Sequence, residues 1–393
     1  MPSINCINTD ECTGCKACAN ICPKDAIVFQ EDEYGFSYPF INAEKCIQCK
    51  KCEQVCNSIK SFNTGLPLKT YAAANKDNNI LRASSSGGVF SVLAEYYLAN
   101  GGYVCGCVYD ENLRPIHICT NRYEDYLQMR KSKYVQSDVG DVYRTVKKLL
   151  QNDKDVLFVG TPCQIAGLKG FLQKNHERLL TVDLVCHGTP SYKMFRAFLD
   201  YLENKYDTKI TDFNFRSKKH GWLRISTEFT DKTGRTRNIG KNQEFYMFSF
   251  SNGDIMRPSC YSCKYASPER VGDITIGDFW GYNKKTSGLS PVNGISLFTL
   301  NTDASLKILE SLSEKLFLEE VDYSAAINGN TCLRHPTRKG RNREKCMKSL
   351  SENRIHEIAE NYVKNNKKRI IIEKIKYTIP IRLYEALRRR KSE

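Results

Sequence analysis

The chain contains the run Cys12-Thr-Gly-Cys15-Lys-Ala-Cys18-Ala-Asn-Ile-Cys22 near its N-terminus and repeats the pattern as Cys46-Ile-Gln-Cys49-Lys-Lys-Cys52-Glu-Gln-Val-Cys56. Both runs have the spacing C-x2-C-x2-C-x3-C. Zinc sites use two C-x2-C pairs without a third cysteine at the same interval, so zinc is the weaker alternative. The doubled run is typical of a protein segment that holds two [4Fe-4S] clusters.

In such a doubled run, each run supplies three thiolates to one cluster and its last cysteine to the other cluster. We therefore expect crossed ligand sets. The first set is Cys12, Cys15, Cys18 and Cys56, and the second set is Cys22, Cys46, Cys49 and Cys52.

Length and composition narrow the class of protein. The chain has 393 residues, of which 41% are hydrophobic and 26% charged; this balance excludes a disordered or membrane-embedded chain. No basic segment followed by an apolar stretch opens the chain, so we expect a cytoplasmic protein without a secretory signal. Cysteines in that compartment are expected to be metal ligands or redox groups.

Shifts in composition predict three domains, at residues 1–60, 70–330 and 335–393. We expect an α/β fold with α+β elements, in which a ferredoxin-like domain precedes a mixed α/β domain and a basic C-terminal tail. In the second domain, predicted strands at 70–74, 102–109, 156–159 and 180–186 alternate with predicted helices at 88–98, 139–150, 164–172 and 192–204. That alternation is typical of parallel β/α units. Residues 210–239 instead predict strands that form an antiparallel extension, with a hairpin turn at 232–235.

Four further cysteines lie at positions that the predicted sheet could bring together. Cys163 follows one predicted strand, Cys186 ends the next, and Cys260 and Cys263 form a C-x2-C pair. Because parallel strands end at the same edge of a sheet, these thiols could hold a third [4Fe-4S] cluster. The alternative is that they are ordinary buried cysteines, which are common and inert.

Several separated motifs carry a family resemblance. They are Ser84-Ser-Ser-Gly-Gly88, Lys131-Ser-Lys-Tyr-Val-Gln-Ser137, Gly160-Thr-Pro-Cys-Gln164, Cys186-His-Gly188, the Cys260/Cys263 pair and Gly277-Asp-Phe-Trp280. With these motifs, the chain resembles the beta subunits of coenzyme F420-reducing hydrogenases and dehydrogenases. The resemblance implies a flavoprotein with FAD beside a [4Fe-4S] cluster, and it favours the third cluster.

The expected FAD contacts are Ser84, Ser85, Ser86, Gly87, Gly88, Lys133 and Tyr134. The serine-glycine stretch directly precedes a predicted helix, whose backbone N–H groups would face an anion such as a flavin diphosphate. An ordinary serine N-cap is the alternative. Lys133 and Tyr134 resemble a lysine-tyrosine segment of the family, and a surface lysine is the alternative there. No residue is assigned a catalytic role.

The net charge of +15 is concentrated in the last domain, since residues 335–393 hold 18 Lys and Arg but only 7 Asp and Glu. We expect no nucleic-acid partner, because no recognisable reading module accompanies this charge. The tail is expected either to pack as a solvated basic helix or to lie peripherally on the inner, anionic membrane surface. Pro380 should interrupt any single helix there.

Two functions follow from these features. The first is an enzyme, an iron-sulfur flavoprotein oxidoreductase that moves electrons between a hydride-carrying substrate, F420-like or other, and [4Fe-4S] clusters through FAD. The second is a non-enzymatic electron-transfer module that docks on a partner enzyme and holds no flavin. Both imply a redox partner protein or a ferredoxin.

Overall fold

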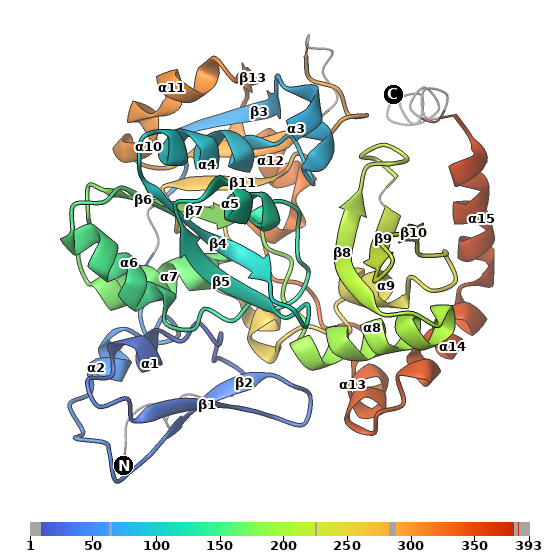
Figure 1. Cartoon of the computed structure of the whole chain (residues 1–393), viewed down its shortest axis with the longest axis horizontal. Coiled ribbons are helices and arrows are strands. Elements are labelled where there is room, and N and C mark those ends of the chain that lie inside the picture. The colour runs from blue at the N-terminus through green and yellow to red at the C-terminus, as the bar shows by residue number, and fades with distance from the viewer. Residues whose placement is uncertain (1–8, 63–64, 225, 283–287, 381–383, 385–393) are drawn as a thin grey trace.

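The computed structural model describes residues 9–62, 65–224, 226–282, 288–380 and 384. A cysteine-rich head, residues 9–62, lies at one end of the molecule, and a large central sheet with helices adjoins it (Figure 1). The head has two short helices and an antiparallel hairpin: α1 (Ala17–Ile21), β1 (Ile27–Glu31), β2 (Ser37–Ile41) and α2 (Lys51–Gln54). Cys18, Ile27 and Ile41 form its small buried core.

Eight strands form the central sheet. They are β3 (Lys69–Asn75), β4 (Tyr103–Tyr109), β5 (Pro115–Thr120), β6 (Val156–Gly160), β7 (Leu179–Leu184), β11 (Ile274–Asp278), β12 (Ser296–Leu300) and β13 (Leu316–Glu320). Their spatial order is β13-β3-β12-β11-β7-β6-β4-β5. The neighbours β4, β6, β7 and β11 are parallel, which confirms the prediction of parallel β/α units for the strands at 102–109, 156–159 and 180–186. The predicted strand at 70–74 differs, because β3 pairs antiparallel with both β12 and β13, and β5 also pairs antiparallel with β4.

Helices cover both faces of this sheet. Those that belong to it are α3 (Asn78–Ala83), α4 (Val89–Ala99), α5 (Tyr123–Met129), α6 (Val142–Gln151), α7 (Pro162–Leu172), α10 (Asp303–Lys307), α11 (Leu309–Ser313) and α12 (Tyr323–Gly329), with short 3-10 turns η2 (Pro258–Ser262) and η3 (Thr331–Leu333). Side chains of α4 and α5 share one core with the sheet. Side chains of α6 and α7 form another core, to which the head contributes Ala17 and Val55. The head therefore docks on α6 and α7.

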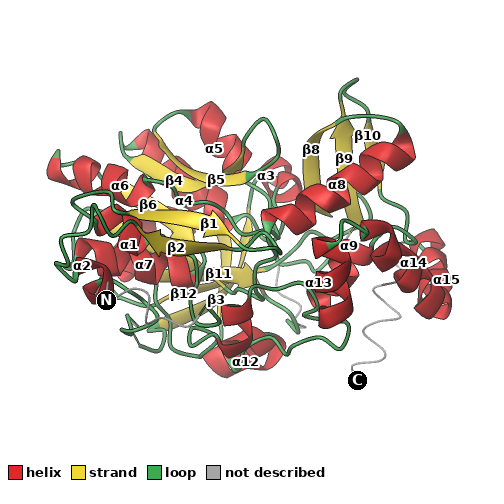
Figure 2. Ribbon diagram, turned by 90° about the horizontal axis from the view of Figure 1, so that it is seen from below, coloured by secondary structure: helices red, strands yellow, loops and turns green. Residues whose placement is uncertain are grey.

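A smaller lobe stands beside the sheet and carries its own three strands (Figure 2). Its elements are α8 (Tyr192–Tyr206), β8 (Ile210–Ser217), β9 (Ser226–Asp231), β10 (Thr236–Asn238), α9 (Phe245–Ser251), α13 (Arg343–Ser351) and α14 (Ile355–Asn365). The strands are antiparallel in the order β10-β9-β8, and the turn at 232–235 joins β9 to β10 as predicted. They form a separate sheet because their aromatic residues bury against α8 and α9.

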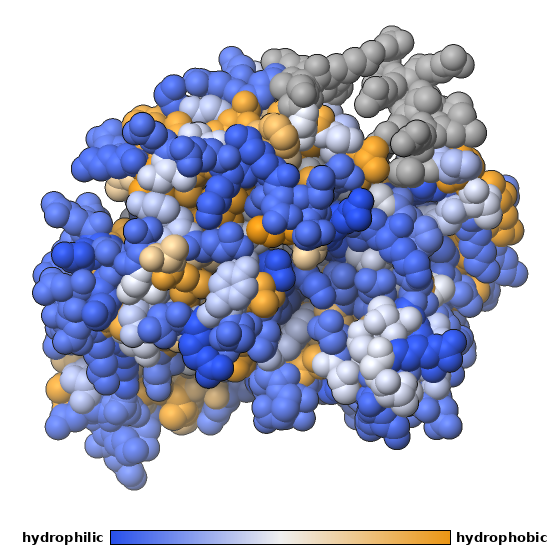
Figure 3. Space-filling model, turned by 45° about the horizontal axis from the view of Figure 1, so that its top comes forward, coloured by the Kyte–Doolittle hydropathy of each residue, from blue (hydrophilic) through white to orange (hydrophobic). Residues whose placement is uncertain are grey.

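The basic tail is helical and partly built into that lobe. Met347 and Leu350 of α13 and Tyr362 of α14 lie in the lobe core. Helix α15 (Lys367–Thr378) ends two residues before Pro380, as expected. Apolar residues are visible at the edge of the molecule where α15 lies, although hydrophilic residues dominate the surface (Figure 3). None of the helices described is long and apolar enough to cross a bilayer. Membrane contact of the tail stays a prediction.

Candidate functional site

A cavity of about 500 Å³ opens where the parallel strands end. Its wall includes Gly160 at the end of β6, Leu184 at the end of β7 and Asp278 at the end of β11. The carboxyl edge of such a sheet is where α/β proteins hold their ligands. Eight of the sequence-predicted residues line it, from four separate stretches of chain. They are Ser84, Ser85, Ser86, Gly88, Lys133, Tyr134, Cys163 and Cys186.

The serine-glycine stretch leads into α4 at the cavity wall. Gly88 is the N-cap of α4, with φ 80°, and no side chain caps the helix there. The backbone of the first turn is therefore available to an anion. The Ser84 and Ser86 hydroxyls donate to backbone carbonyls, and the Ser85 hydroxyl accepts from the Ser132 amide. The three hydroxyls thus hold the loop in shape.

Gly87 differs from the expectation, because it packs against the sheet and does not line the cavity. Its amide donates to Ser296 Oγ at 2.9 Å. A Cβ atom at this position would lie 2.2 Å from the Ala73 carbonyl oxygen. The glycine is needed for the close approach of the loop to β3 and β12.

Lys133 and Tyr134 lie in the cavity wall with different partners. The Lys133 ammonium donates to the carbonyls of Gln128, at 2.9 Å, and Arg130, at 3.4 Å. Burial lowers the pKa of Lys133. The Tyr134 hydroxyl accepts from Arg216 Nη1 at 2.9 Å. The lysine therefore braces its own loop, whereas the tyrosine joins a polar network.

The centre of that network is a buried ion pair that the sequence did not indicate. Arg216 on β8 pairs with Asp278 on β11 at 2.6 Å, and their side chains are 4% and 13% exposed. The Trp222 indole also donates to Asp278, and its ring stacks on Trp280 at 4.6 Å between centroids. Asp278 and Trp280 lie in a sequence motif to which no role could be given from the residues alone. Arg216 carried no signal, because only the fold brings β8 to the central sheet.

Four body cysteines converge beside the cavity. Cys163 lies in the first turn of α7, Cys186 follows β7, and Cys260 and Cys263 lie in and directly after η2. Burial raises the pKa of Cys186, and the charges of the other three thiols raise it further. The pKa of Cys263 is also raised, to about 11, and burial is the main cause. The four thiols are thus close enough to interact; we call them the body set.

The head thiols lie in two groups, and the crossed ligand sets stay a prediction. Burial raises the pKa of Cys18, with added contributions from Cys15, Cys12 and Cys56; these four form the inner set. A cavity of about 60 Å³ is lined by the other four thiols, the outer set. Its members are Cys22, Cys46, Cys49 and Cys52.

These thiol groups fit iron-sulfur clusters in donor chemistry. In the described part of the chain, no three His, Cys, Asp or Glu side chains are placed to hold one metal ion. A cubane cluster makes a different demand, because each thiolate binds its own iron. Buried thiols resist ionisation, and a metal bond to sulfur supplies the missing stabilisation of the thiolate.

The inner set lies against the body set. Asn57, which is 1% exposed, follows Cys56 and donates from Nδ2 to the Cys163 carbonyl at 2.7 Å. A Cβ atom on Gly167 of α7 would lie 3.0 Å from Cys15 Sγ. The three thiol sets therefore form a series from Cys49, which is exposed, to the cavity.

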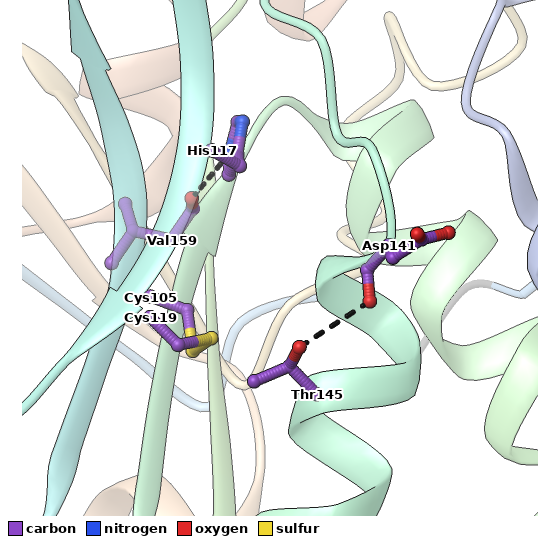
Figure 4. Close-up of a disulfide and its surroundings, with 6 residues drawn as sticks. All are labelled: Cys105, His117, Cys119, Asp141, Thr145 and Val159. Atoms are coloured by element: carbon purple, nitrogen blue, oxygen red, sulfur yellow. Dashed lines mark hydrogen bonds between the residues drawn. A yellow bond between two sulfur atoms is a disulfide. The ribbon is translucent and has the colours of Figure 1, made fainter.

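A disulfide joins β4 and β5 near the cavity (Figure 4). Cys105 and Cys119 face each other across these strands and are bonded. For these two cysteines the bond differs from the expectation of metal ligands or redox groups, because strand register, which is not visible in the sequence, brings them together. Next to the bond, His117 contacts the Val159 carbonyl through Nε2 at 3.2 Å. Its buried Nδ1 has no hydrogen-bond partner among the described residues.

Comparisons with known proteins agree with the two parts of the chain. Residues 153–326 match the family model that describes the C terminus of the coenzyme F420 hydrogenase/dehydrogenase beta subunit. Residues 11–58 match the 4Fe-4S dicluster domain. No curated protein matches the chain significantly in sequence.

Among solved structures, the chain is similar to one from the F420-reducing [NiFe] hydrogenase complex of Methanosarcina barkeri. The identity is 17% and the TM-score 0.46, over 79% of this chain and 95% of that one. Residues 153–326 therefore belong to the C-terminal domain family of the coenzyme F420 hydrogenase/dehydrogenase beta subunits, and residues 11–58 form a 4Fe-4S dicluster domain.

Proposed function

We propose that the protein is an iron-sulfur flavoprotein oxidoreductase that moves electrons between a hydride-carrying substrate, F420 or a similar carrier, and three [4Fe-4S] clusters. Membership of the family supports an oxidoreductase. One observation carries the finer proposal. Cys163 and Cys186 belong both to the body set and to the wall of the large cavity.

We assign the cavity to FAD. The open first turn of α4 would bind the diphosphate, since the helix carries no side-chain cap and its N-terminus attracts anions. Tyr134, Arg216 and Asp278 would hold the polar side of the ring through the network described above. Bound FAD would supply the conversion between a two-electron hydride and the single electrons that a cluster accepts.

We assign the inner, outer and body sets to one [4Fe-4S] cluster each. The outer set is the proposed contact point for a redox partner protein or a ferredoxin, because Cys49 is exposed. Exposed lysines surround that point, among them Lys24, Lys50 and Lys51. They would attract an acidic partner surface.

The test is anaerobic purification of the full chain with iron, sulfide and flavin quantified together. We expect about twelve iron atoms per chain from three cubane clusters and one flavin. Reduced F420, NADH and NADPH are then screened for bleaching of the flavin absorbance. Cys260→Ser should remove about four iron atoms and spare the head clusters. Cys346→Ala, which changes a buried thiol outside the three sets, is the matched control.

Flavin retention decides between the two functions. If the protein has full iron and is supplied with FAD and FMN but retains neither, the enzyme is ruled out. The chain is then an electron-transfer module. If Cys260→Ser leaves the iron content unchanged, the third cluster is ruled out.

A further inference from the structure

Arg257 is a buried arginine between the body set and the head. It is 1% exposed and lies three residues before Cys260. Its guanidinium donates to three neutral oxygens: the Cys12 carbonyl at 2.6 Å, the Ser37 carbonyl at 2.8 Å and Gln136 Oε1 at 3.0 Å. Among the residues that the structure describes, no carboxylate lies within 4 Å of it. The charge of Arg257 is therefore not offset by an ion pair.

A buried charge without an opposite charge is costly, by several kcal/mol per ion. Arg270, the other arginine with less than 2% exposure, avoids this cost by pairing with Asp183 at 2.9 Å. Hydrogen bonds to carbonyls satisfy the N–H groups of Arg257 but leave its net charge. The guanidinium carbon also lies 4.5 Å from the centre of the Tyr38 ring, and this cation–π contact offsets part of the cost. A nearby anion would offset the rest.

The position of Arg257 suggests which anion this is. The Arg257 side chain contacts the backbone of Cys12, which belongs to the inner set. The Arg257 backbone carbonyl accepts a hydrogen bond at 3.0 Å from the amide of Cys260, which belongs to the body set. Four thiolates outweigh the positive charge of a cubane core, so each filled set is a net anion that becomes more negative on reduction. Arg257 lies between two such groups.

We propose that Arg257 is a shared counter-charge for the inner and body clusters, and that it raises the reduction potential of both relative to the outer cluster. This inference rests on the proposed ligand sets. A nearby positive charge stabilises the reduced, more negative form of a cluster, and low local polarity strengthens that effect. Arg257 is thus a positioning residue that makes electron entry at the cavity end favourable.

The experiment is an EPR-monitored redox titration of the full chain, prepared anaerobically with full iron. Arg257→Gln removes the positive charge. Arg257→Lys keeps the positive charge but loses the planar guanidinium group. Gln136→Glu places a carboxylate beside the guanidinium with little change of shape. The matched control is Arg144→Gln. Arg144 also donates to head carbonyls, of Ala19, Asn20 and Cys22, but it is half-exposed and pairs with Asp25 at 2.6 Å.

For Arg257→Gln we expect the reduction equilibria of two clusters to become at least tenfold less favourable, which is 59 mV for one electron. The third cluster should shift by less than threefold. Gln136→Glu should move the same two clusters in the same direction. Arg257→Lys and Arg144→Gln should shift none of them by as much as tenfold.

Three results would overturn the inference. The first is that all clusters of Arg257→Gln titrate as in the wild type while iron is full. The second is that all three clusters shift equally. The third is that Arg257→Lys shifts the potentials as much as Arg257→Gln does. The iron count of the wild type separates each of these results from failure of the proposed function. If only the head clusters are present, the inner cluster alone still tests the role of Arg257.

Discussion

The crossed assignment, in which the last cysteine of each head run binds the cluster of the other run, can be tested directly with Cys22→Ala. Cys22 is the last cysteine of the first run, but in the structure it lines the cavity formed with Cys46, Cys49 and Cys52. We therefore expect Cys22→Ala to remove the outer cluster and spare the inner one. The expected loss is about four iron and four sulfide atoms per chain, or a third of about twelve.

The assay combines iron and sulfide analysis with EPR of the reduced protein. Cys22→Ala and Cys49→Ala should lose the same signal, since both remove an outer ligand. Cys56→Ala and Cys12→Ala should both lose a second EPR signal, that of the inner cluster, since both remove an inner ligand. Cys346→Ala should keep full iron. If Cys22→Ala instead lost the signal that Cys12→Ala loses, each run would hold its own cluster, and the crossed assignment would be refuted.

Two further predictions concern the cavity wall. Asp278→Asn leaves the buried Arg216 without a carboxylate, so the free energy of unfolding should fall by about 3–5 kcal/mol, measured by urea unfolding followed by tryptophan fluorescence. The control is Asp212→Asn, because Asp212 forms an exposed ion pair with Lys131 at 3.7 Å; this variant should change the free energy of unfolding by less than about 1 kcal/mol. Equal effects of the two variants would contradict the reasoning. Burial lowers the pKa of His117 to about 4, so from pH 6.5 downward the unfolded chain binds a proton that the native state does not, and stability falls with falling pH. Between pH 6.5 and 5 the wild type should lose about 2 kcal/mol more than His117→Phe; the same urea unfolding at both pH values checks this, and parallel losses would count against it.

Features with local sequence signals were predicted well. The doubled cysteine runs indicated the ferredoxin-like head, and the alternation of strand and helix patterns indicated the parallel strands β4, β6 and β7. Both signals repeat over short distances, so they do not depend on the rest of the fold. The grouping of Cys163 with Cys186 followed from the same logic, because neighbouring parallel strands end at one edge.

Features that depend on pairing between distant segments were not predictable. The strands at 210–239 were recognised, but the expected antiparallel extension was wrong: β8, β9 and β10 form a sheet of their own, because strand pairing depends on contacts that the local pattern does not show. Arg216 meets Asp278 only because β8 lies in the separate lobe beside the cavity. Asn57 follows the second run where Pro23 follows the first, and nothing in this local pattern shows its bond to the Cys163 carbonyl, which needs the docked head.

The docking of the head has a consequence for how freely such modules can be exchanged. Val55 lies in one core with α6 and α7, and a Cβ atom on Gly170 would lie 2.5 Å from the Val55 carbonyl oxygen. Asn57 adds a polar contact whose amide must match one carbonyl of the body. A ferredoxin domain grafted from another protein would have to reproduce this backbone clearance and this amide as well as the cysteine spacing. Chimeras of this family should therefore be cut after residue 60 only if helix α7 is exchanged together with the head.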